Sequence, residues 1–210
     1  MACLFAIEGE AHAEGHALIA GVDEVGRGCV AGPVYAGAVV FEGPLELPGL
    51  DDSKALLPEV REAVALRIGL AARCAAVGAA TAAEIDAIGI VAATFLAMRR
   101  ALGCARASGG IPSLVLVDAF RIPGLDVSQR AYVRGDSRVA AIAAASIVAK
   151  VARDARMDEL DRRFPFYGFG SHKGYATPEH LSALRRHGPC PEHRLTFDRV
   201  LTRRGAAKAA

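Results

Sequence analysis

The sequence contains no tryptophan, and aromatic residues make up only 6% of its 210 residues. Its hydrophobic content of 52% comes mainly from alanine, valine, leucine and isoleucine, which is enough for a folded globular core. No apolar run reaches the ~18 residues that span a bilayer, so we predict no membrane-spanning segment. The N-terminal stretch lacks a basic start and meets Glu8 and Glu10 early, so we expect no secretory signal and a cytoplasmic protein.

The sequence has only five cysteines, which is an odd number. None of them belongs to a Cys-x-x-Cys pair. This usage is typical of reduced thiols in a cytosolic protein. His187, Cys190 and His193 are spaced like zinc ligands, with His180 upstream. Two prolines separate them and no second pair completes four ligands, so structural zinc is not predicted. The Gly-x-Ser-x-Gly elbow of serine hydrolases is also missing.

The net charge of +2 is unevenly distributed along the chain. Residues 1–149 hold 12 basic and 16 acidic side chains, whereas residues 150–210 hold 13 and 7. The C-terminal third is therefore basic and the remainder acidic. This division fits a phosphate-binding surface beside a metal site, and it fits equally well a solvated helix face rich in arginine.

Hydrophobic patterning predicts a mixed α/β chain. Strands are expected over 17–25, 33–42, 73–81, 113–120 and 130–136. Helices are expected over 56–70 with Ser53 as N-cap, over 82–89 with Thr81 as N-cap, over 90–107, over 138–163, and from Pro178 with Thr177 as N-cap. We expect residues 1–163 to form a core with a mixed central sheet flanked by helices, and residues 164–210 to form a helical C-terminal extension within the same compact unit.

Four acids stand where predicted strands end or a loop meets a helix: Asp23, Glu24, Asp118 and Asp136. Clustered carboxylates repel one another, and hard divalent cations such as Mg²⁺ or Mn²⁺ relieve that repulsion. Two such ions about 4 Å apart activate water for phosphodiester hydrolysis. Each acid taken singly is also compatible with a role as a cap, a turn residue or an ion-pair partner.

The glycines after the first acids superficially imitate a dinucleotide-binding loop. Their spacing is Gly-x-Gly-x-x-x-Gly, and Pro33 begins a strand where that motif requires a helix. We therefore reject a nucleotide cofactor. Gly26 and Gly28 instead allow a ligand to approach the backbone closely, while Arg27 offers its guanidinium to a phosphate.

A second glycine-bearing loop carries groups that suit a nucleic-acid strand. Ser171, His172 and Lys173 offer a hydroxyl and cations for phosphate, and Tyr175 offers a ring for a sugar or base. The alternative is an ordinary surface loop. Lys54 can similarly reach a phosphate, although an exposed lysine at a helix start is the commoner case.

Five motifs, in order, resemble bacterial ribonuclease HII. They read GVDEVGRGCVAGPVYAGAVV, DDSK, VLVDAF, GDSRVAAIAAASIVAKVARD and YGFGSHKGYATPEH, and the similarity runs from about Ile19 to Phe197. The resemblance implies a ribonuclease H-like fold and a metal-dependent endonuclease. Such an enzyme cuts the RNA strand of RNA–DNA hybrids and incises duplex DNA on the 5′ side of a single ribonucleotide, leaving 3′-hydroxyl and 5′-phosphate ends.

The resemblance also implies roles for residues. Asp23, Glu24, Asp118 and Asp136 match the catalytic, metal-binding acids, with Mg²⁺ or Mn²⁺ as cofactor. Gly26, Arg27 and Gly28 match the segment that senses the ribose 2′-hydroxyl, and Tyr175 matches the tyrosine that packs on the sugar. With Lys54, Ser171, His172 and Lys173, these residues form the expected substrate-binding set. The C-terminal extension is expected to bind nucleic acid.

Several features depart from the family pattern or compete with this interpretation. Asp154 is a rival fourth acid, although an ion pair with Arg153 or Arg156 is the easier interpretation. Ala119 stands where glycine is common and Cys29 where proline is common. A non-catalytic nucleic-acid-binding module and a different nuclease of the same fold remain alternatives. We expect a monomer, and no sequence motif indicates a protein partner.

Overall fold

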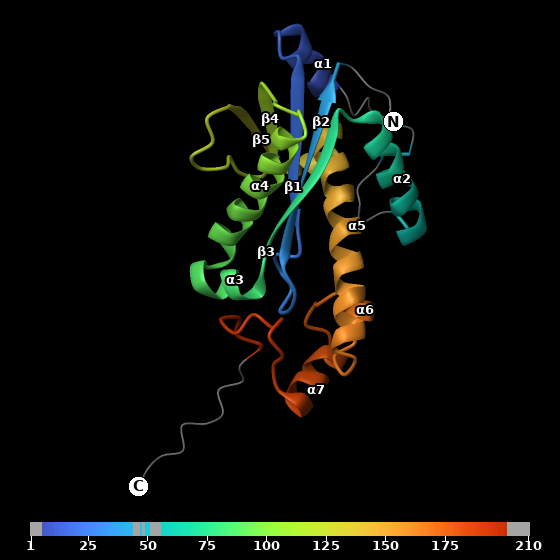
Figure 1. The fold of residues 1–210 in the computed structure, drawn as a ribbon, viewed down its shortest axis with the longest axis vertical. Helices are drawn as coiled ribbons and strands as arrows, with labels where there is room; N and C mark the ends of the chain where they lie inside the picture. The colour runs from blue at the N-terminus through green and yellow to red at the C-terminus, as the bar shows by residue number, and fades with distance from the viewer. Residues whose placement is uncertain (1–5, 44–46, 48, 51–55, 201–210) are drawn as a thin grey trace.

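The structure is a computed structural model, and it describes residues 6–43, 47, 49–50 and 56–200. A five-stranded sheet with the order β3-β2-β1-β4-β5 forms its centre (Figure 1). The strands are β1 (Leu18–Val25), β2 (Val34–Glu42), β3 (Cys74–Ala80), β4 (Leu114–Asp118) and β5 (Ser128–Tyr132). The sheet is mixed, because β1–β2 and β2–β3 pair antiparallel whereas β1–β4 and β4–β5 pair parallel.

The helices account for the rest of the regular structure. They are α1 (Ala6–Ala13), α2 (Pro58–Ala71), α3 (Ala82–Ile88), α4 (Ile90–Ala107), the 3₁₀ helix η1 (Gly135–Ser137), α5 (Ala140–Arg163), α6 (Phe169–His172) and α7 (Pro178–His187). The fold class expected from the sequence, a mixed sheet flanked by helices, is confirmed. Thr81 and Thr177 cap α3 and α7 as predicted, since each side-chain oxygen accepts a main-chain N–H.

Local differences from the expected elements have identifiable causes. The last strand stops at Tyr132 rather than running to Asp136, because Arg134 adopts a left-handed conformation (φ 54°) that turns the chain into η1. The helix expected after Ser53 begins at Pro58, where Leu57 is the N-cap without a side-chain cap bond; Ser53 itself lies outside the described residues. The short helices α1 and α6 were not predicted.

Helices cover both faces of the sheet. One face packs on α4, through alanines and valines of β1 and β2. The other face packs on α5 and α2, with α1 against its end. Gly21 and Gly37 allow α5 to lie directly on the strands, since a Cβ at either position would come within 2.0–2.2 Å of the α5 backbone.

The described part of the C-terminal extension lies at the end of the sheet where β1 finishes (Figure 1). Its side chains Tyr167, Phe169 and Leu184 share a buried cluster with Val30 and Ala31, which belong to the loop between β1 and β2. The extension therefore contacts the loop that follows Asp23 and Glu24. Within the described residues, no helix is both long and apolar enough to cross a bilayer.

Candidate active site

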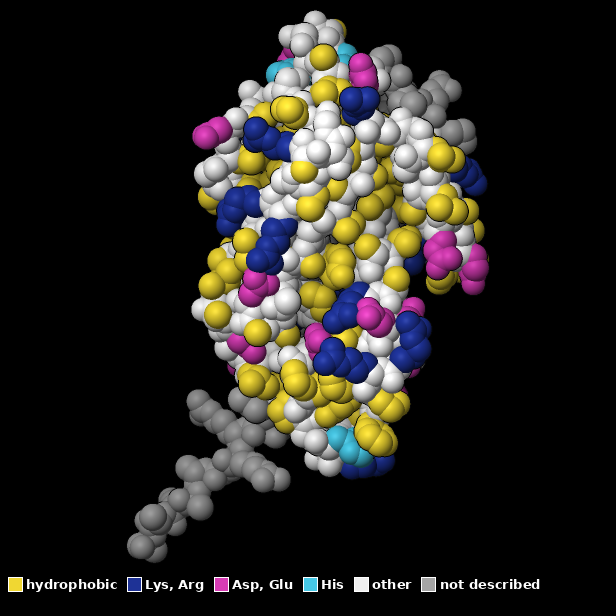
Figure 2. Space-filling model, viewed as in Figure 1, with side chains coloured by type: hydrophobic (Ala, Val, Ile, Leu, Met, Phe, Trp, Pro, Cys, Tyr) yellow, Lys and Arg dark blue, Asp and Glu magenta, His cyan; other side chains and the backbone are white. Residues whose placement is uncertain are grey.

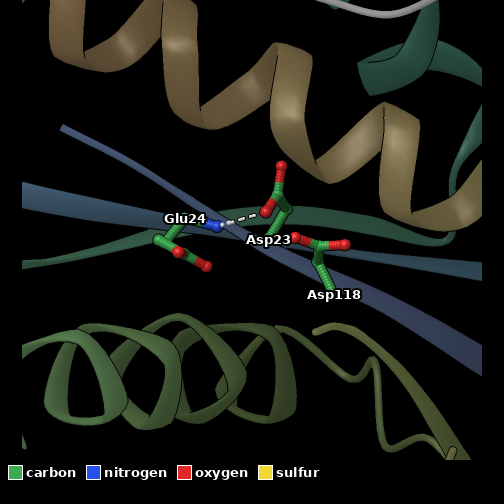
Figure 3. Close-up of side chains that lie close together, drawn as sticks. All are labelled: Asp23, Glu24 and Asp118. Atoms are coloured by element: carbon green, nitrogen blue, oxygen red, sulfur yellow. Dashed lines mark hydrogen bonds between the residues drawn. The ribbon is translucent and has the colours of Figure 1, made fainter. Parts of the chain in front are cut away.

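Three acids meet where two parallel neighbouring strands end. The β1–β4 register pairs Val22 with Val117, so Asp23 and Asp118 follow on adjacent strands. One ligand oxygen from each of Asp23, Glu24 and Asp118 lies within 4.8 Å of the others. Figure 3 shows Asp23 pointing toward α5, with Asp118 beside it and Glu24 on the opposite side of the strand from Asp23. Three of the four acids expected from the sequence therefore form one group.

The protein holds each of these carboxylates in a defined orientation. Asp23 accepts the main-chain N–H of Glu24 at 2.7 Å, and the hydroxyl of Ser146 on α5 also bonds to its carboxyl group. Asp118 accepts the N–H of Gly135 at 2.7 Å. Arg27 donates to Glu24 at 3.1 Å. The site is thus assembled from β1, β4, α5 and η1.

Burial and the charges of neighbouring acids disfavour the ionised forms of Asp23 and Glu24. Burial, followed by the charges of Glu24 and Asp118, raises the pKa of Asp23 well above its ordinary value of 3.8. Burial also raises the pKa of Glu24, although Arg27 opposes this shift. A group of hard oxygen donors whose charges repel one another has the chemistry of a divalent-cation site.

A cleft of about 570 Å³ opens beside the acids, between α4 and the loop after β4. Glu24, Arg27 and Asp118 form its polar side, and Phe95 and Phe120 belong to its apolar side. Glu24 and Asp118 are therefore reachable from outside, whereas Asp23 is buried and does not line the cleft.

The other two acids named from the sequence lie outside this group. Asp136 is half-buried in η1, directly after the Gly135 whose N–H orients Asp118. Asp154 forms an ion pair with Lys150 at 2.6 Å and with Arg61 at 3.5 Å. The ion-pair interpretation of Asp154 is confirmed, but its partners are these two residues rather than Arg153 or Arg156.

The loop after β1 presents Gly28 outward. No atom lies within 4 Å of the position that a Cβ on Gly28 would occupy. At Gly26 (φ +91°), by contrast, a Cβ would lie 2.2 Å from Nε of Arg153. The side chain of Arg27 is 40% exposed. One side of this loop is therefore open to a ligand, and the other rests on the protein.

The side chains of the loop 171–175, which were expected to contact nucleic acid, differ in how exposed they are and in whether they already have partners within the protein. Ser171 is exposed and the Tyr175 side chain is 46% exposed. His172 uses both ring nitrogens internally, on Tyr167 O at 2.7 Å and on the Gly174 N–H at 3.2 Å. Lys173 forms an ion pair with Asp158. Lys54 lies outside the described residues.

The structure shows the conformation of Ala119 and the environment of Cys29, the two residues that depart from the family pattern. Ala119 has φ 58°, a left-handed conformation that costs alanine about 1–2 kcal/mol and explains why glycine suits this position. Cys29 is fully buried, and its sulfur lies 3.6 Å from Lys173 O. This burial keeps the Cys29 thiol away from solvent.

Sequence patterns did not single out two buried arginines beside the site. Arg153 and Arg194 have no exposed surface, and both bond to carbonyl oxygens of the loop after β1. One signal was present for Arg153, which falls on the buried stripe of α5 at helical spacing from Ala149 and Met157. For Arg194 the sequence offers no such periodicity, because it lies outside any regular element.

The surface seen in Figure 2 carries both signs of charge. Basic and acidic side chains lie next to one another over the C-terminal half of α5, with apolar side chains between them. The excess of basic residues in the C-terminal third is therefore partly offset by neighbouring acids on this face.

The mixed sheet with three carboxylates at the ends of β1 and β4 defines a ribonuclease H-like protein. Solved structures show the same fold. The ribonuclease H2 of Pyrococcus horikoshii OT3 matches with a TM-score of 0.65 and 25% identity, covering 87% of this chain and 95% of that one. The Bst-RNase HIII in complex with Mn²⁺ matches with a TM-score of 0.71 at 20% identity, covering 90% of this chain and 70% of that one.

Sequence comparison then defines the family. A family model described as Ribonuclease HII matches residues 20–200. The ribonuclease HII of Paracidovorax citrulli (strain AAC00-1) is 50% identical over 90% of this chain and 78% of its own length, and that of Geobacillus kaustophilus (strain HTA426) is 49% identical over 92% and 73%. The chain belongs to the ribonuclease HII family and is an RNase H endoribonuclease. This membership decides against a non-catalytic binding module.

Proposed function

We propose that this ribonuclease cuts the RNA strand of RNA–DNA hybrids and incises duplex DNA 5′ of a single ribonucleotide, with Mg²⁺ or Mn²⁺ as cofactor and 3′-hydroxyl and 5′-phosphate ends as products. The observation that carries the proposal is the placement of three carboxylates next to a loop with an open backbone. Asp23, Glu24 and Asp118 supply the metal site, and Gly28, four residues after Glu24, has no atom within 4 Å of the position that a Cβ would occupy.

The residues present fit a divalent cation. All three donors are carboxylate oxygens, and the site leaves room for water and phosphate in the adjoining cleft. Burial raises the pKa of both Asp23 and Glu24, and Arg27 opposes the shift only at Glu24, so a divalent cation would stabilise the ionised form of both carboxyl groups. We assign Asp136 as the fourth acid, contributed from η1 next to Gly135.

Divalent ions bound here supply positive charge at the scissile phosphate and a water of lowered pKa. The protein's own part is orientation. Ser146 and the Glu24 N–H hold the Asp23 carboxylate, and the Gly135 N–H holds that of Asp118, so both groups keep a defined orientation in which they would hold a metal. Arg27 is exposed enough to contact a phosphate while it still bonds to Glu24.

Recognition of the ribose is proposed for the loop of Gly26, Arg27 and Gly28 together with Tyr175. A 2′-hydroxyl both donates and accepts hydrogen bonds, and it is the group that separates RNA from DNA at a given site. An open backbone at Gly28 and a half-exposed tyrosine ring suit a sugar. Residues 164–210, with Ser171, Lys173 and the basic excess of the C-terminal third, are proposed to bind the duplex backbone.

The deciding experiment compares three labelled duplexes: all-DNA, RNA–DNA hybrid, and DNA with one ribonucleotide. We expect the wild type to cut the last two in Mg²⁺ or Mn²⁺ and to cut nothing with a chelator. Asp118→Asn should lower the rate by about a thousandfold or more, because a metal ligand supplies several kcal/mol of transition-state stabilisation. Asp136→Asn, in the same assay, tests the fourth acid.

Asp126→Asn is the matched control, since it makes the same chemical change at an exposed position in the loop before β5. It should cut at the wild-type rate. Cleavage of the ribonucleotide duplex by Asp118→Asn at the wild-type rate would refute the site assignment. Cleavage of the all-DNA duplex by the wild type would indicate a different nuclease specificity on this fold.

A further inference from the structure

The two loops that we propose to contact the ribose, one carrying Gly28 and the other Tyr175, are hydrogen-bonded to each other. The N–H groups of Val30 and Ala31 both donate to Gly174 O, at 2.9 and 3.3 Å. The contact is so close that a Cβ on Gly174 would lie 2.4 Å from Ala31 O. The loop that carries Gly28 and the loop that carries Tyr175 therefore have a set spacing.

A third segment, residues 192–194, pairs with the first of these loops. Gly32 donates its N–H to Glu192 O at 2.8 Å, and Arg194 donates its N–H to Val30 O at 2.9 Å. The two bonds flank an antiparallel bridge between Ala31 and His193. The side chains of His193 and Arg194 then reach the two loops separately.

The side chain of Arg194 binds the backbone carbonyl groups of the loop after β1. Its guanidinium donates to Gly26 O at 2.8 Å, to Arg27 O at 2.9 Å and to Gly32 O at 2.9 Å. Among the described residues it hydrogen-bonds no carboxylate, although it is completely buried. A buried charge without an anionic partner is expensive unless every donor is satisfied. Four of the five guanidinium N–H groups are satisfied here, all by backbone carbonyl oxygens.

The consequence follows from peptide geometry. In a trans peptide the carbonyl of one residue and the N–H of the next point in opposite directions within one plane. Drawing Gly26 O and Arg27 O inward onto Arg194 therefore turns the N–H groups of Arg27 and Gly28 outward. Within the described part of the chain, no group accepts a hydrogen bond from either N–H. Both are left for a ligand.

His193 acts on the other loop through a chain of imidazoles. Its Nδ1 lies 3.0 Å from Cys190 N and 3.3 Å from Cys190 O. The closer contact, in which Nδ1 accepts the Cys190 N–H, places the proton on Nε2, which donates to His180 Nε2 at 3.0 Å. His180 then has its proton on Nδ1, which donates to Tyr175 O at 2.8 Å. The opposite tautomers would set His180 Nδ1 and Tyr175 O, two acceptors, against each other.

We propose that His193 and Arg194 are a pair of positioning residues that orient the Arg27 and Gly28 amides and the Tyr175 backbone, and thereby set the preference for ribose over deoxyribose. This inference rests on the proposed function. Neither side chain touches the substrate in this arrangement. Both act through the backbone that does.

The test is the variant Arg194→Lys, in which we measure the preference of the enzyme for the single-ribonucleotide duplex over the all-DNA duplex. Lysine keeps the charge but lacks the planar fork that reaches three carbonyls at once. The affinity of the all-DNA duplex is obtained as a competitive inhibition constant and compared with the KM of the single-ribonucleotide duplex. We expect the preference for ribose to fall about tenfold or more, while the all-DNA affinity stays unchanged.

Two further measurements separate positioning from folding. In Arg194→Ala, millimolar guanidinium should restore the preference, whereas methylammonium at the same concentration should not. His193→Leu should lower the preference and His193→Gln, which keeps a donor toward His180, should retain more of it. Arg106→Lys, the same change on the exposed surface of α4, is the control. If Arg194→Lys does not fold, the His193 pair of variants decides the question.

The outcomes are distinct. A lower yield of folded protein would reduce every rate in proportion and leave the preference unchanged, which would overturn the positioning role. Wild-type preference in Arg194→Lys or in His193→Leu would overturn it as well. A wild type that neither prefers nor cuts the ribonucleotide duplex would instead overturn the proposed function on which the inference rests.

Discussion

At the scale of single residues, a substitution at Gly28 should affect substrate recognition without affecting the stability of the fold. Nothing lies within 4 Å of its missing Cβ, so Gly28→Ala should change the free energy of unfolding by no more than about 0.5 kcal/mol. The added methyl group would occupy the open side of the loop, where we place the sugar. We expect kcat/KM on the single-ribonucleotide duplex to fall about tenfold or more, measured beside urea unfolding.

Gly26→Ala is the informative comparison at this scale. Its Cβ would meet Nε of Arg153 at 2.2 Å in a backbone conformation of positive φ, so both stability and activity should fall. A Gly28→Ala protein that is equally destabilised, or that keeps wild-type activity, would contradict the assignment of an open recognition edge.

At the scale of elements, the contact of α5 with β1 places the buried acid. Asp23 lies on the face of β1 covered by α5, where Ser146 bonds to it, and Gly21 two residues earlier allows the close approach. Gly21→Ala would set a Cβ 2.0 Å from the carbonyl group of Ala141, which must force the helix away. We expect a loss of about 3 kcal/mol or more in urea unfolding, with loss of divalent-metal affinity.

Gly103→Ala provides the control for that prediction. Gly103 lies in α4, is exposed, and has no atom within 4 Å of its missing Cβ. The same substitution should therefore stabilise the protein by about 0.5–1 kcal/mol through helix propensity. Equal effects of the two changes would show that α5 does not need close contact with β1.

At the scale of the whole molecule, the acid cluster lowers the stability of the metal-free protein. Burial and the charges of Glu24 and Asp118 raise the pKa of Asp23 above 3.8. At pH values between the ordinary pKa of Asp23 in the unfolded chain and its raised pKa in the folded protein, the folded state binds more protons than the unfolded state. The free energy of unfolding contributed by Asp23 therefore falls as pH rises through this range.

Removing one charge should then stabilise the metal-free enzyme while abolishing its activity. Asp118→Asn keeps an oxygen for the Gly135 N–H but removes a negative charge beside Asp23. With chelator at neutral pH we expect the variant to be more stable than the wild type by about 1 kcal/mol. Mg²⁺ at a hundred times its Kd should add about 2.7 kcal/mol to the wild type and less to the variant.

Chelator and Mg²⁺ titrations monitored by thermal unfolding measure both quantities. A variant that is less stable than the wild type under chelation, or that gains as much from Mg²⁺, would show that Asp118 does not contribute to the metal site. This readout needs no cleavage, so it is independent of the substrate assigned to the enzyme.

Much of the site was accessible from the sequence because it depends on local pattern. An apolar run that ends in an acid indicates a strand terminus, and Asp23 and Asp118 were recognised in this way. The grouping needed one more fact, the parallel pairing of β1 with β4, which involves residues about 95 positions apart. Asp136 shows the limit, since the strand predicted to end there stops at Tyr132 and the chain turns into η1.

The sequence by itself determined the fold class, the family, the strand-end acids and the caps of α3 and α7, because each follows from residue order along a short stretch of chain. Only the tertiary structure decided the burial of Arg194, its bonds to Gly26 and Arg27, and the imidazole chain from His193 to Tyr175. Those contacts join segments more than a hundred residues apart or depend on ring tautomers, and no local periodicity encodes either. They exist because a buried guanidinium or imidazole needs hydrogen-bond partners, and folding brings those partners from distant parts of the chain.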